Sequence, residues 1–402
     1  MHILLIHQAF SALDQPGGTR HYELALHLAR RGHLVTVIAS PVSYLTGKAH
    51  AAGEHLSLDG NVAILRAYTY PALHRSFVHR VLSFFSFMAS SFLAGFKVRQ
   101  VDLVWGTSPP LFQGFTAWAL SRLKRVPYLF EVRDLWPAFA IQVGVLKNPL
   151  LIRLSEWLER FLYRHAACVV VNSPGFIPHV QQRGARHIQL VSNGADPRMF
   201  DPASDGMRFR QAHNLEDKFV VMYAGAHGLS NDLGVLLQAA RQLQDHPEIA
   251  IVLLGDGMDK PALLAQAAAW GLNNVHFLPP LPKTQVGEAL AAADACIAIL
   301  KPLPLYSTVY PNKVFDYMAA GRPVLLAIDG VIREVVEDAG AGLFVPPGDP
   351  HALAAAICRL SGDPVSARRM GFNARRCVEE HFDREVLAEQ FASLLEEMVG
   401  NK

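Results

Sequence analysis

The sequence is poor in the residues and motifs that mark several common kinds of site. It has only four cysteines in 402 residues, and no two of them form a Cys-x-x-Cys pair. Cys168 and Cys296 lie inside the apolar runs "AACVVV" and "DACIAIL", so we expect reduced core residues rather than a disulfide framework. No Asp-x-Asp and no His/Cys/Asp cluster at metal-ligand spacing occurs, so no metal site is expected.

Glycine-rich phosphate motifs are also missing. The pattern GxGxxG does not follow the first predicted strand, and GxxxxGK[ST] occurs nowhere, which disfavours a nicotinamide dehydrogenase and a P-loop enzyme. The opening stretch "MHILLIH" is too short and too uncharged for a signal peptide, and it is expected to form a buried strand.

Charge is divided unevenly between the two halves of the chain. Residues 1–200 hold 20 Lys and Arg against 10 Asp and Glu, whereas the remainder hold 17 against 25. A basic half indicates a domain that faces an anionic surface or ligand. Basic residues spread evenly for solubility would give the same balance, and this alternative stays open.

Short apolar strands alternate with helical stretches through both halves. Strands are predicted at "HILLIH", "LVTVIAS", "DLVWG", "PYLFEV", "ACVVVN" and "IQLVSN", and then at "FVVMYAG", "IAIVLLGDG", "VHFLPPL", "ACIAIL", "PVLLAI" and "GLFVPPG". This alternation is typical of parallel sheets with helices on both faces. We therefore predict an α/β protein with two doubly wound, Rossmann-like domains at 1–200 and 201–377, joined through the polar stretch 194–209.

Small and polar residues follow the predicted strands of the first half, at the edge where doubly wound sheets bind ligands. Gly17 and Gly18 precede a helix that Thr19 is expected to cap, and its free N–H groups favour an anion, although a plain turn would also explain the glycines. Arg133 and Asp134 form either a structural salt bridge or a general base beside a guanidinium. Other candidates end neighbouring strands: Thr107, Ser108, Asn172, Ser173, Asn193 and Gly194.

The second half has two informative stretches. "YAGAHGLSNDLG" follows its first strand, and "ILKPLPLYSTVYPNKVFDYMAAGRPVLL" leads from a strand through a proline-rich loop into a helix. Free N–H groups at that helix start, together with two lysines, suit a diphosphate, and an acid one turn into the helix suits ribose hydroxyls. The candidates are Gly225, His227, Gly228, Lys301, Thr308, Val309, Tyr310, Lys313 and Asp316.

Several blocks of the sequence, taken in order, resemble the retaining glycosyltransferases of family 4, which have the GT-B fold. These blocks are "GGTRHYELALHLARRGHLVTVIAS", "VSNGADPRMF", "LGDG", "FLPPLPKTQVGEALAAADACIAIL" and "VFDYMAAGRPVLL", and they span nearly the whole chain. Within the family, "FEVRDLWP", "WGTSPPLF" and "YAGAHG" are most similar to bacterial surface-polysaccharide (O-antigen or capsule) enzymes of the N-acetyl-fucosaminyl transferase type.

The resemblance implies two domains that face each other across a cleft, with a nucleotide sugar in the second and an acceptor in the first. It also implies a closing helix, residues 378–402, that crosses back to the first domain. The two donor glutamates of the family correspond to Thr308 and Asp316, so Asp316 is expected to hold the ribose, and the sugar is left undetermined. The usual first-domain histidine falls near Arg133 and Asp134, and either of these is a catalytic candidate together with Lys301.

The family's basic pair is missing, because Ala226 and Asp232 stand in its region, so Lys301 and Lys313 are expected to take the phosphates. The resemblance implies a UDP-sugar substrate, no cofactor, and a glycan or polyprenyl-diphosphate-linked acceptor; no nucleic-acid partner is expected. The donor-binding set is then Gly17, Gly18, Gly225, His227, Gly228, Thr308, Val309, Tyr310, Lys313 and Asp316, and the acceptor-binding set is Arg20, Thr107 and Ser108.

Residues 74–100 contain a 16-residue apolar run, which is short for a membrane span of about 20 residues. Two interpretations stay open: a helix buried between two strands, or a patch that dips into an anionic bilayer. The second would place a cytoplasmic protein at the inner face of the cytoplasmic membrane. It would use the flanking basic residues and the aromatic residues of the run, which are Arg75, Arg80, Lys97, Arg99, Phe84, Phe85 and Phe87.

Two other functions fit the same pattern. A nucleotide-sugar epimerase of the same fold would use the same donor site. A non-catalytic nucleotide-sugar-binding subunit would explain why Thr308 replaces a glutamate and why the basic pair is missing. Release of nucleoside diphosphate only in the presence of a lipid acceptor separates a transferase from both.

Overall fold

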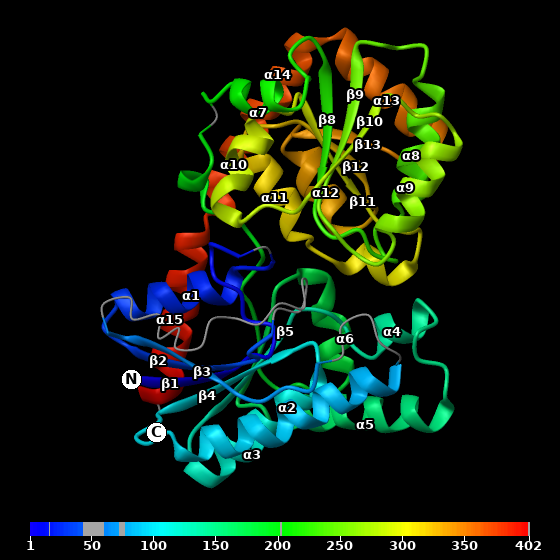
Figure 1. Ribbon diagram of the computed structural model, residues 1–402. Coiled ribbons are helices and arrows are strands. Elements are labelled where there is room, and N and C mark those ends of the chain that lie inside the picture. Colours follow the sequence, from blue (N-terminus) through cyan, green and yellow to red (C-terminus); the bar gives the residue numbers. More distant parts are fainter. Residues whose placement is uncertain (16, 43–59, 72–76, 202, 401–402) are drawn as a thin grey trace. The chain divides into compact units, whose positions relative to one another are not determined.

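The computed structural model describes residues 1–15, 17–42, 60–71, 77–201 and 203–400. The chain forms two compact units. The first unit comprises Met1–Leu13, Gly17–Ser192 and Glu385–Lys402, and the second comprises Asp14–Pro16 and Asn193–Arg384. Each unit is a layer of strands flanked by helices (Figure 1).

The first unit is built on a seven-stranded parallel sheet with the order β3-β2-β1-β4-β5-β6-β7. Its inner strands are short runs of buried apolar residues, as expected when helices cover both faces of a parallel sheet. The strands are β1 (His2–Ile6), β2 (Leu34–Ala39), β3 (Val62–Arg66), β4 (Leu103–Ser108), β5 (Tyr128–Val132), β6 (Cys168–Val171) and β7 (Ile188–Leu190).

Helices cover both faces of this first sheet. On one face, α1 (Arg20–Arg30) and α15 (Arg384–Gly400) share a core with the strands, in which the rings of Trp105 and Phe391 lie 4.7 Å apart. On the other face, α3 (Leu111–Lys124) packs between α2 (Phe77–Lys97) and α5 (Pro149–His165). Asn148 caps α5 by accepting from the backbone N–H groups of Leu150 and Leu151. The short helices are α4 (Ala138–Gln142), η1 (Pro174–Phe176) and α6 (Ile177–Gln182).

The second unit is built on a six-stranded parallel sheet with the order β10-β9-β8-β11-β12-β13. The strands are β8 (Phe219–Ala224), β9 (Ile249–Leu254), β10 (Val275–Leu278), β11 (Ala295–Ile299), β12 (Val324–Ala327) and β13 (Gly342–Phe344). The helices are η2 (Pro197–Met199), α7 (Met207–Ala212), α8 (Leu233–Gln242), α9 (Lys260–Ala269), α10 (Lys283–Ala291), η3 (Pro304–Thr308), α11 (Asn312–Ala319), α12 (Val331–Asp338), α13 (Pro350–Gly362) and α14 (Pro364–His381).

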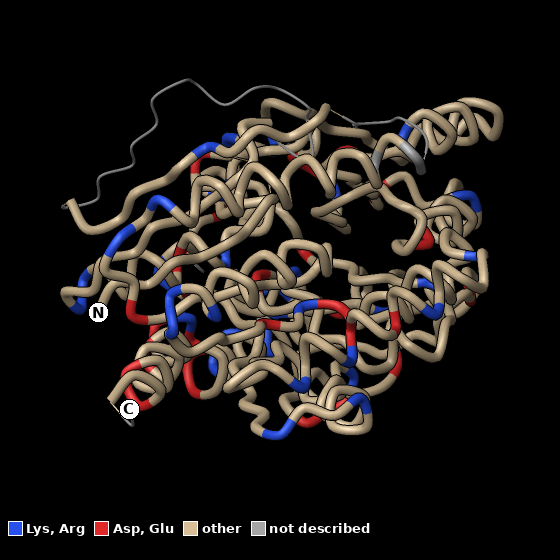
Figure 2. The backbone as a smooth tube through the Cα atoms, turned by 90° about the horizontal axis from the view of Figure 1, so that it is seen from below, with Lys and Arg blue, Asp and Glu red and all other residues tan. Residues whose placement is uncertain are grey.

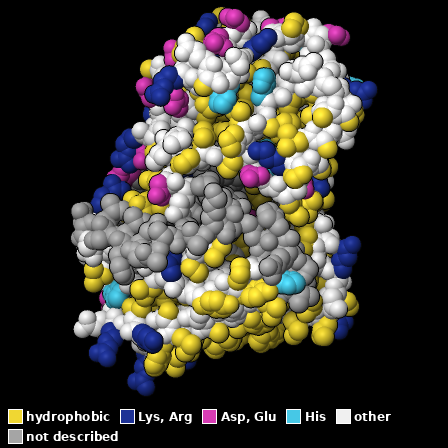
Figure 3. Space-filling model, viewed as in Figure 1, with side chains coloured by type: hydrophobic (Ala, Val, Ile, Leu, Met, Phe, Trp, Pro, Cys, Tyr) yellow, Lys and Arg dark blue, Asp and Glu magenta, His cyan; other side chains and the backbone are white. Residues whose placement is uncertain are grey.

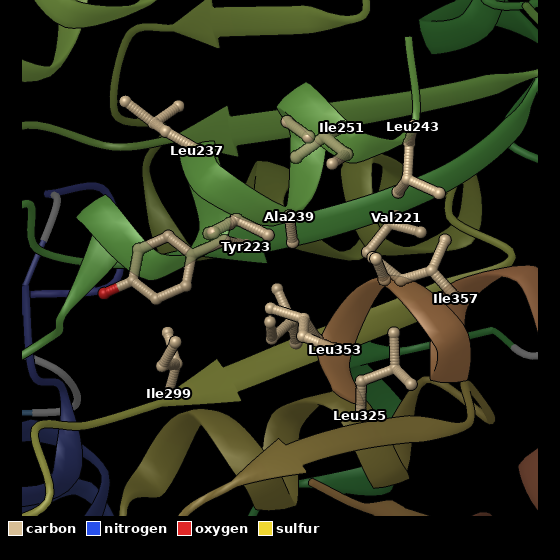
Figure 4. Close-up of a cluster of buried hydrophobic side chains, with 14 of the residues drawn as sticks. Val221, Tyr223, Leu237, Ala239, Leu243, Ile251, Ile299, Leu325, Leu353 and Ile357 are labelled. Atoms are coloured by element: carbon tan, nitrogen blue, oxygen red, sulfur yellow. The ribbon is translucent and has the colours of Figure 1, made fainter. Parts of the chain in front are cut away.

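The core of the second unit is formed where α8, α9 and α13 pack on the sheet. Figure 4 shows part of this cluster, in which Tyr223 of β8 lies near Leu237 and Ile299, and Leu353 of α13 lies among strand residues. Tyr223 is 0% exposed, so its ring is wholly part of the core. The core therefore reaches the end of β8, where the candidate site begins.

The predicted fold class, two doubly wound parallel α/β sheets, is confirmed, and each predicted strand is present. The sequence analysis missed β3. The structure divides the chain between Ser192 and Asn193 rather than at residue 200, because the residues that follow join the second unit. Asn193 Nδ2, for example, donates to Tyr310 O at 2.8 Å.

The closing helix also differs from the prediction of residues 378–402. Residues through His381 belong to α14, and the last helix, α15, begins at Arg384. Phe382 interrupts the two helices because its ring packs against Phe315 at 4.7 Å, and the next residue pairs with Ala195 in an isolated parallel bridge.

Candidate functional site

A buried carboxylate with two partners lies on β5 of the first unit. Glu131 Oε1 accepts from Arg20 Nε at 2.8 Å, and Glu131 Oε2 lies 2.6 Å from His21 Nε2. Burial by itself raises the pKa of Glu131, but the contacts with His21 and Arg20 outweigh burial and hold that pKa below its usual range. Glu131 is therefore an ionised group with both oxygens occupied.

Arg20 is fixed by the same network. Its side chain is 6% exposed, and Nη1 and Nη2 donate to Ser192 O and Val191 O, each at 2.7 Å. Arg20 thus ties the start of α1 to β5 and to the residues that follow β7. The predicted acceptor-binding role of Arg20 is corrected to a structural one, because the protein itself uses these donors.

The predicted capping role of Thr19 is also corrected. Thr19 makes no capping hydrogen bond, and its hydroxyl donates to Glu23 Oε1 at 2.5 Å instead. Before it, Gly17 has a φ of +142°, and a Cβ on Gly18 would meet nothing within 4 Å. The glycine pair therefore leaves open space beside the backbone, as a turn that admits a ligand requires.

Three buried polar groups at the ends of β1 and β4 have no hydrogen-bond partner in the part of the chain that the structure describes. They are His7 Nδ1, Thr107 Oγ1 and Ser108 Oγ. Burial, followed by the charges of His21 and Arg133, holds the pKa of His7 well below its usual value, so this ring is neutral. Thr107 and Ser108 are 0% and 1% exposed, so their hydroxyls lie below the surface and do not present the predicted acceptor contact in this conformation.

Arg133 and Asp134 follow β5 and face different surroundings. Arg133 Nε donates to Ser108 O at 3.0 Å, and no ion pair joins Arg133 to Asp134 in the described chain. Burial raises the pKa of Asp134 to about 6 against the opposing charge of Arg133, and the residue is nevertheless exposed at the surface of the unit. Of the two alternatives for this pair, the salt bridge is not formed, and Asp134 is accessible.

Two loops at the ends of β8 and β9 meet backbone to backbone in the second unit. We call residues 225–228 and 255–257 the glycine loops. Gly255 has a φ of +150°, and a Cβ there would lie 1.9 Å from Gly225 O. A Cβ on Gly257, at φ +158°, would lie 2.3 Å from His227 O, and His227 N donates to Asp256 O at 2.8 Å. Only glycine permits this approach, so the two loops support each other.

The side chain of His227 is buried beneath the backbone of the glycine loops and does not reach their surface. It is 0% exposed, and neither ring nitrogen has a partner among the described residues. Burial, followed by the charge of Lys260, lowers the pKa of His227 to about 4, so the ring is neutral near pH 7. The structure therefore places His227 within the predicted donor region but does not present its ring to a ligand in this conformation.

Lys313 brings a cation to the glycine loops. A Cβ on Gly225 would lie 2.9 Å from Lys313 Nζ, which donates to Tyr223 Oη at 2.7 Å and to Asn231 Oδ1 at 3.1 Å. Tyr223 Oη lies 2.7 Å from Ala226 O, to which it donates. Burial lowers the pKa of Lys313 to about 7, although part of the side chain stays exposed. No carboxylate within the described chain pairs with this ammonium group.

Lys301, the second predicted phosphate ligand, approaches the same region after β11. Its backbone N–H donates to Ser230 O at 3.0 Å. Burial raises the pKa of Asp232, and the nearby charge of Lys301 opposes that rise. Both lysines therefore contact the loop that follows β8, as the prediction of a shared phosphate site requires.

Asp316 lies on α11, one turn beyond Lys313. Its Oδ2 is 2.5 Å from Lys283 Nζ and 3.4 Å from Asn312 Nδ2, whereas Asp316 Oδ1 is buried without a partner among the described residues. Thr308 ends η3, and its hydroxyl donates to Leu305 O at 2.7 Å. The helix itself begins only at Asn312, so Val309 and Tyr310, predicted at its start, lie in the extended segment before it.

The second unit thus combines a cation that lacks a counter-charge, backbone loops that only glycine can form, and a carboxylate with one unused oxygen. An ammonium group beside loop N–H groups suits a phosphate, and a free carboxylate oxygen suits a hydroxyl donor. Within the described residues, no three His, Cys, Asp or Glu side chains are grouped so that they could hold a metal ion.

Two family models match most of the chain. The glycosyl transferase 4-like domain matches residues 17–194, and the glycosyl transferases group 1 model matches residues 218–363. The chain is a family 4 glycosyltransferase. The glycosyltransferase is 24% identical over 385 residues to a putative colanic acid biosynthesis glycosyl transferase, WcaI, of Escherichia coli (strain K12), which covers 92% of this chain and 93% of that relative.

Solved structures show that the glycosyltransferase has the GT-B fold. A sucrose-phosphate synthase from Thermosynechococcus elongatus matches with a TM-score of 0.80 and 20% identity over 100% of both chains. The HepE protein of Anabaena, in complex with UDP and glucose, matches with a TM-score of 0.76 and 20% identity over 99% of this chain and 100% of that one.

Sequence reasoning missed several residues of the glycosyltransferase that shape these sites. Glu131, His7 and Lys283 were not predicted. His7 directly follows β1 and Glu131 is the next-to-last residue of β5, so the expectation that ligands bind at strand ends could have indicated both. Lys283 carries no such signal, because it reaches Asp316 only when α10 and α11 pack together.

Proposed function

We propose that this glycosyltransferase moves a sugar from a UDP-sugar donor to a glycan or polyprenyl-diphosphate-linked acceptor in the synthesis of a bacterial surface polysaccharide. The observation that carries the proposal is Lys313, a cation without a carboxylate partner in the described chain, beside the glycine loops. The UDP and glucose held by HepE and the colanic-acid assignment of WcaI support the donor and the pathway class.

On the donor side, Lys313 and Lys301 receive the diphosphate together with the loop N–H group of Gly228, and Gly225 lets the ligand approach the backbone. Asp316 accepts a ribose hydroxyl through its unused Oδ1. Thr308, Val309 and Tyr310 border the sugar, and the short Thr308 side chain leaves room for an N-acetylated hexosamine or deoxyhexosamine. The sequence similarity to N-acetyl-fucosaminyl transferases favours this class of sugar.

The chemistry of the proposed reaction is a retaining transfer without a metal. Negative charge develops on the diphosphate as its bond to the anomeric carbon breaks, and fixed cations stabilise such charge most when they are already in place. Lys301 and Lys313 supply these cations, and the sequence offers no Asp-x-Asp ligand pair for a metal. On the acceptor side, Arg133 is held by backbone carbonyls and Asp134 is accessible, so we assign the contact with the reacting hydroxyl to this pair.

The test is release of UDP from a panel of UDP-sugars, with and without a polyprenyl-diphosphate-linked acceptor, in the presence of EDTA. We expect acceptor-dependent UDP release that survives the chelator. Restoration of lost turnover by magnesium or manganese would contradict metal independence, and UDP release that ignores the acceptor would contradict transfer.

A non-catalytic subunit is the second candidate, because Thr308 supplies no carboxylate near the donor sugar. Such a subunit binds UDP in calorimetry but releases none from any UDP-sugar. An epimerase of the same fold would convert the donor sugar without any acceptor.

A further inference from the structure

Helix α2 exposes an apolar stripe to solvent. Its exposed members recur at helical spacing and are Leu82 (49% exposed), Phe85 (46%), Leu93 (63%) and Phe96 (61%). Phe87, on the opposite side, is 1% exposed. Neither sequence interpretation of this segment is therefore complete: α2 buries one side against the protein and exposes an apolar one. Phe87 is not available for insertion into a bilayer, and Arg75 lies outside the described residues.

Helix α5 carries a second exposed apolar stripe, which the sequence analysis did not single out. Its members are Leu150 (63% exposed), Leu151 (39%), Leu154 (53%) and Trp157 (57%). The Trp157 ring stacks on Phe161 at a centroid distance of 5.4 Å, so the indole is held in place at the surface. A large exposed aromatic beside three exposed leucines is unusual for a surface in contact with water alone.

Helix α3 joins the two stripes. Phe112 of α3 packs against Phe85 at 4.9 Å, and Trp118 of α3 packs against Phe161 of α5 at 4.7 Å. Figure 3 shows hydrophobic side chains gathered over the part of the view where Figure 1 places α2, α3 and α5. We call this surface the apolar face; its exposed residues are Leu82, Phe85, Leu93, Phe96, Leu123, Leu150, Leu151, Leu154 and Trp157.

The apolar face has a basic edge. On α5, Arg153 and Arg160 are exposed and follow Leu150 and Trp157 of the apolar stripe by three positions. Arg164 is also exposed and follows Phe161, the ring on which Trp157 stacks, by three positions. Lys97 and Arg122 are exposed near the ends of α2 and α3 (Figure 2 marks basic positions on the backbone).

On the three helices, acidic residues offset this edge only at Arg160. The described sequences of α2 and α3 contain no Asp or Glu. On α5, Glu156 pairs with Arg160 at 3.5 Å and with Arg183 at 3.2 Å, and the Glu159 side chain is 0% exposed. The surface that borders the apolar face is therefore positively charged.

We propose that the apolar face is the surface by which this protein docks on an anionic lipid bilayer. Leucine, phenylalanine and tryptophan side chains insert at the boundary of headgroups and acyl chains, and flanking Lys and Arg bind anionic headgroups. In the described part of the chain, no helix is long and apolar enough to cross a membrane. A second copy of the chain fits less well, because a symmetric contact would bring the basic edges of the two copies together.

Docking through the apolar face determines how far the ends of β4 and β5 lie from the lipid surface. The three helices form one layer on the first sheet, and a helix layer is roughly 10 Å thick. The loops after β4 and β5, with Arg133 and Asp134, then lie about one layer above the lipid surface. The inference deepens the proposed function, because the identity of the partner rests on the lipid-linked acceptor proposed there.

The experiment is flotation of the full chain with vesicles of phosphatidylcholine that contain or lack phosphatidylglycerol, at low and high salt. We expect flotation only with phosphatidylglycerol and a strong decrease at high salt. The variant Leu93→Gln/Leu154→Gln/Trp157→Gln is expected to reduce partitioning at least tenfold. The variant Lys97→Gln/Arg153→Gln/Arg164→Gln is also expected to reduce it at least tenfold, since each basic residue near the surface contributes about fivefold.

Matched control variants come from α14 of the second unit. Val365 and Phe372 are both 68% exposed, and Arg368 and Arg369 are exposed beside them. Val365→Gln/Phe372→Gln and Arg368→Gln/Arg369→Gln are expected to leave flotation unchanged. Thermal unfolding and UDP calorimetry on every variant report folding and the donor site separately.

Three results would overturn the inference. The first is a wild-type protein that fails to float at low salt while it still binds UDP. The second is a loss of flotation in the control variants as large as that in the variants of the apolar face. The third is a dimer in sedimentation that the variants of the apolar face dissociate, while no variant changes flotation. Failure of UDP binding with intact flotation would instead contradict the proposed function alone.

Discussion

The strand ends of the two units hold their charges in opposite ways. In the first unit, both oxygens of Glu131 are occupied by buried partners, and the three donors of Arg20 in that network are occupied as well. In the second unit, the partners of Lys313 within the described chain are the neutral side chains of Tyr223 and Asn231, and Asp316 keeps one buried oxygen that no described residue contacts by a hydrogen bond. A closed network stabilises the protein, whereas an open one is prepared for a ligand.

The largest expected effect is a loss of stability on replacing Glu131, in the closed network of the first unit. Glu131→Gln leaves the guanidinium of Arg20 buried without a counter-charge, which is expected to lower the free energy of unfolding by about 3 to 5 kcal/mol. Denaturant titration followed by circular dichroism measures this loss. The double variant Arg20→Met/Glu131→Leu removes both charges and is expected to recover much of the stability. A Glu131→Gln protein of unchanged stability would contradict a structural role for the pair.

Lys313→Ala tests the open network. The variant is expected to weaken UDP binding by about 3 kcal/mol, the upper range for a hydrogen bond to a charged group, with little loss of stability. Calorimetry measures the first and denaturant titration the second. A loss of stability comparable to that of Glu131→Gln, with UDP affinity intact, would reverse the comparison.

The same lysine gives UDP binding a pH dependence. The pKa of Lys313 is lowered to about 7, and the diphosphate prefers the protonated form, so affinity is expected to fall as the pH rises from about 6 to about 8.5. Lys313→Arg stays charged throughout this range and should bind UDP with a much flatter pH profile. Equal slopes for wild-type and Lys313→Arg proteins would show that another group titrates.

Asp316→Ala is the smallest of the expected effects. Loss of its free Oδ1 is expected to cost about 1 to 3 kcal/mol of UDP affinity and to remove the preference for UDP over 2′-deoxy-UDP. Calorimetry with both nucleotides measures the difference. If Asp316→Ala keeps the preference, the ribose is held elsewhere.

The fold was largely predictable because its inner strands are continuous apolar runs, which a parallel sheet buries on both faces. The strand that was missed, β3, lies at the edge of its sheet, where only part of Val62–Arg66 is buried. The start of the last helix was predicted at Val378 but lies at Arg384. It could not be predicted from the sequence, because the break between α14 and α15 depends on the packing of Phe382 against Phe315.

The candidate sites were predictable only where a residue's neighbours in the chain determine its role. Gly225 and Lys313 stand in local patterns that indicate a phosphate site, and the structure brings them together. Arg20 was misassigned because its partner, Glu131, is 111 residues away, and Lys283 was missed because it meets Asp316 only through helix packing. Partners that are distant in the sequence leave no trace in composition or spacing.

The side chain of Tyr223 has two roles. Its ring fills the core of the second unit (Figure 4), and its hydroxyl joins Ala226 O to Lys313 Nζ. Replacement by phenylalanine preserves the packing but removes one of the two hydrogen-bond acceptors of Lys313 and leaves Asn231 Oδ1. Replacement by a smaller residue disturbs both the packing and the hydrogen bond. During evolution, the core of this unit and its ligand preference therefore cannot change independently. Substitutions that repack the sheet under α8 must be accompanied by a new partner that orients Lys313.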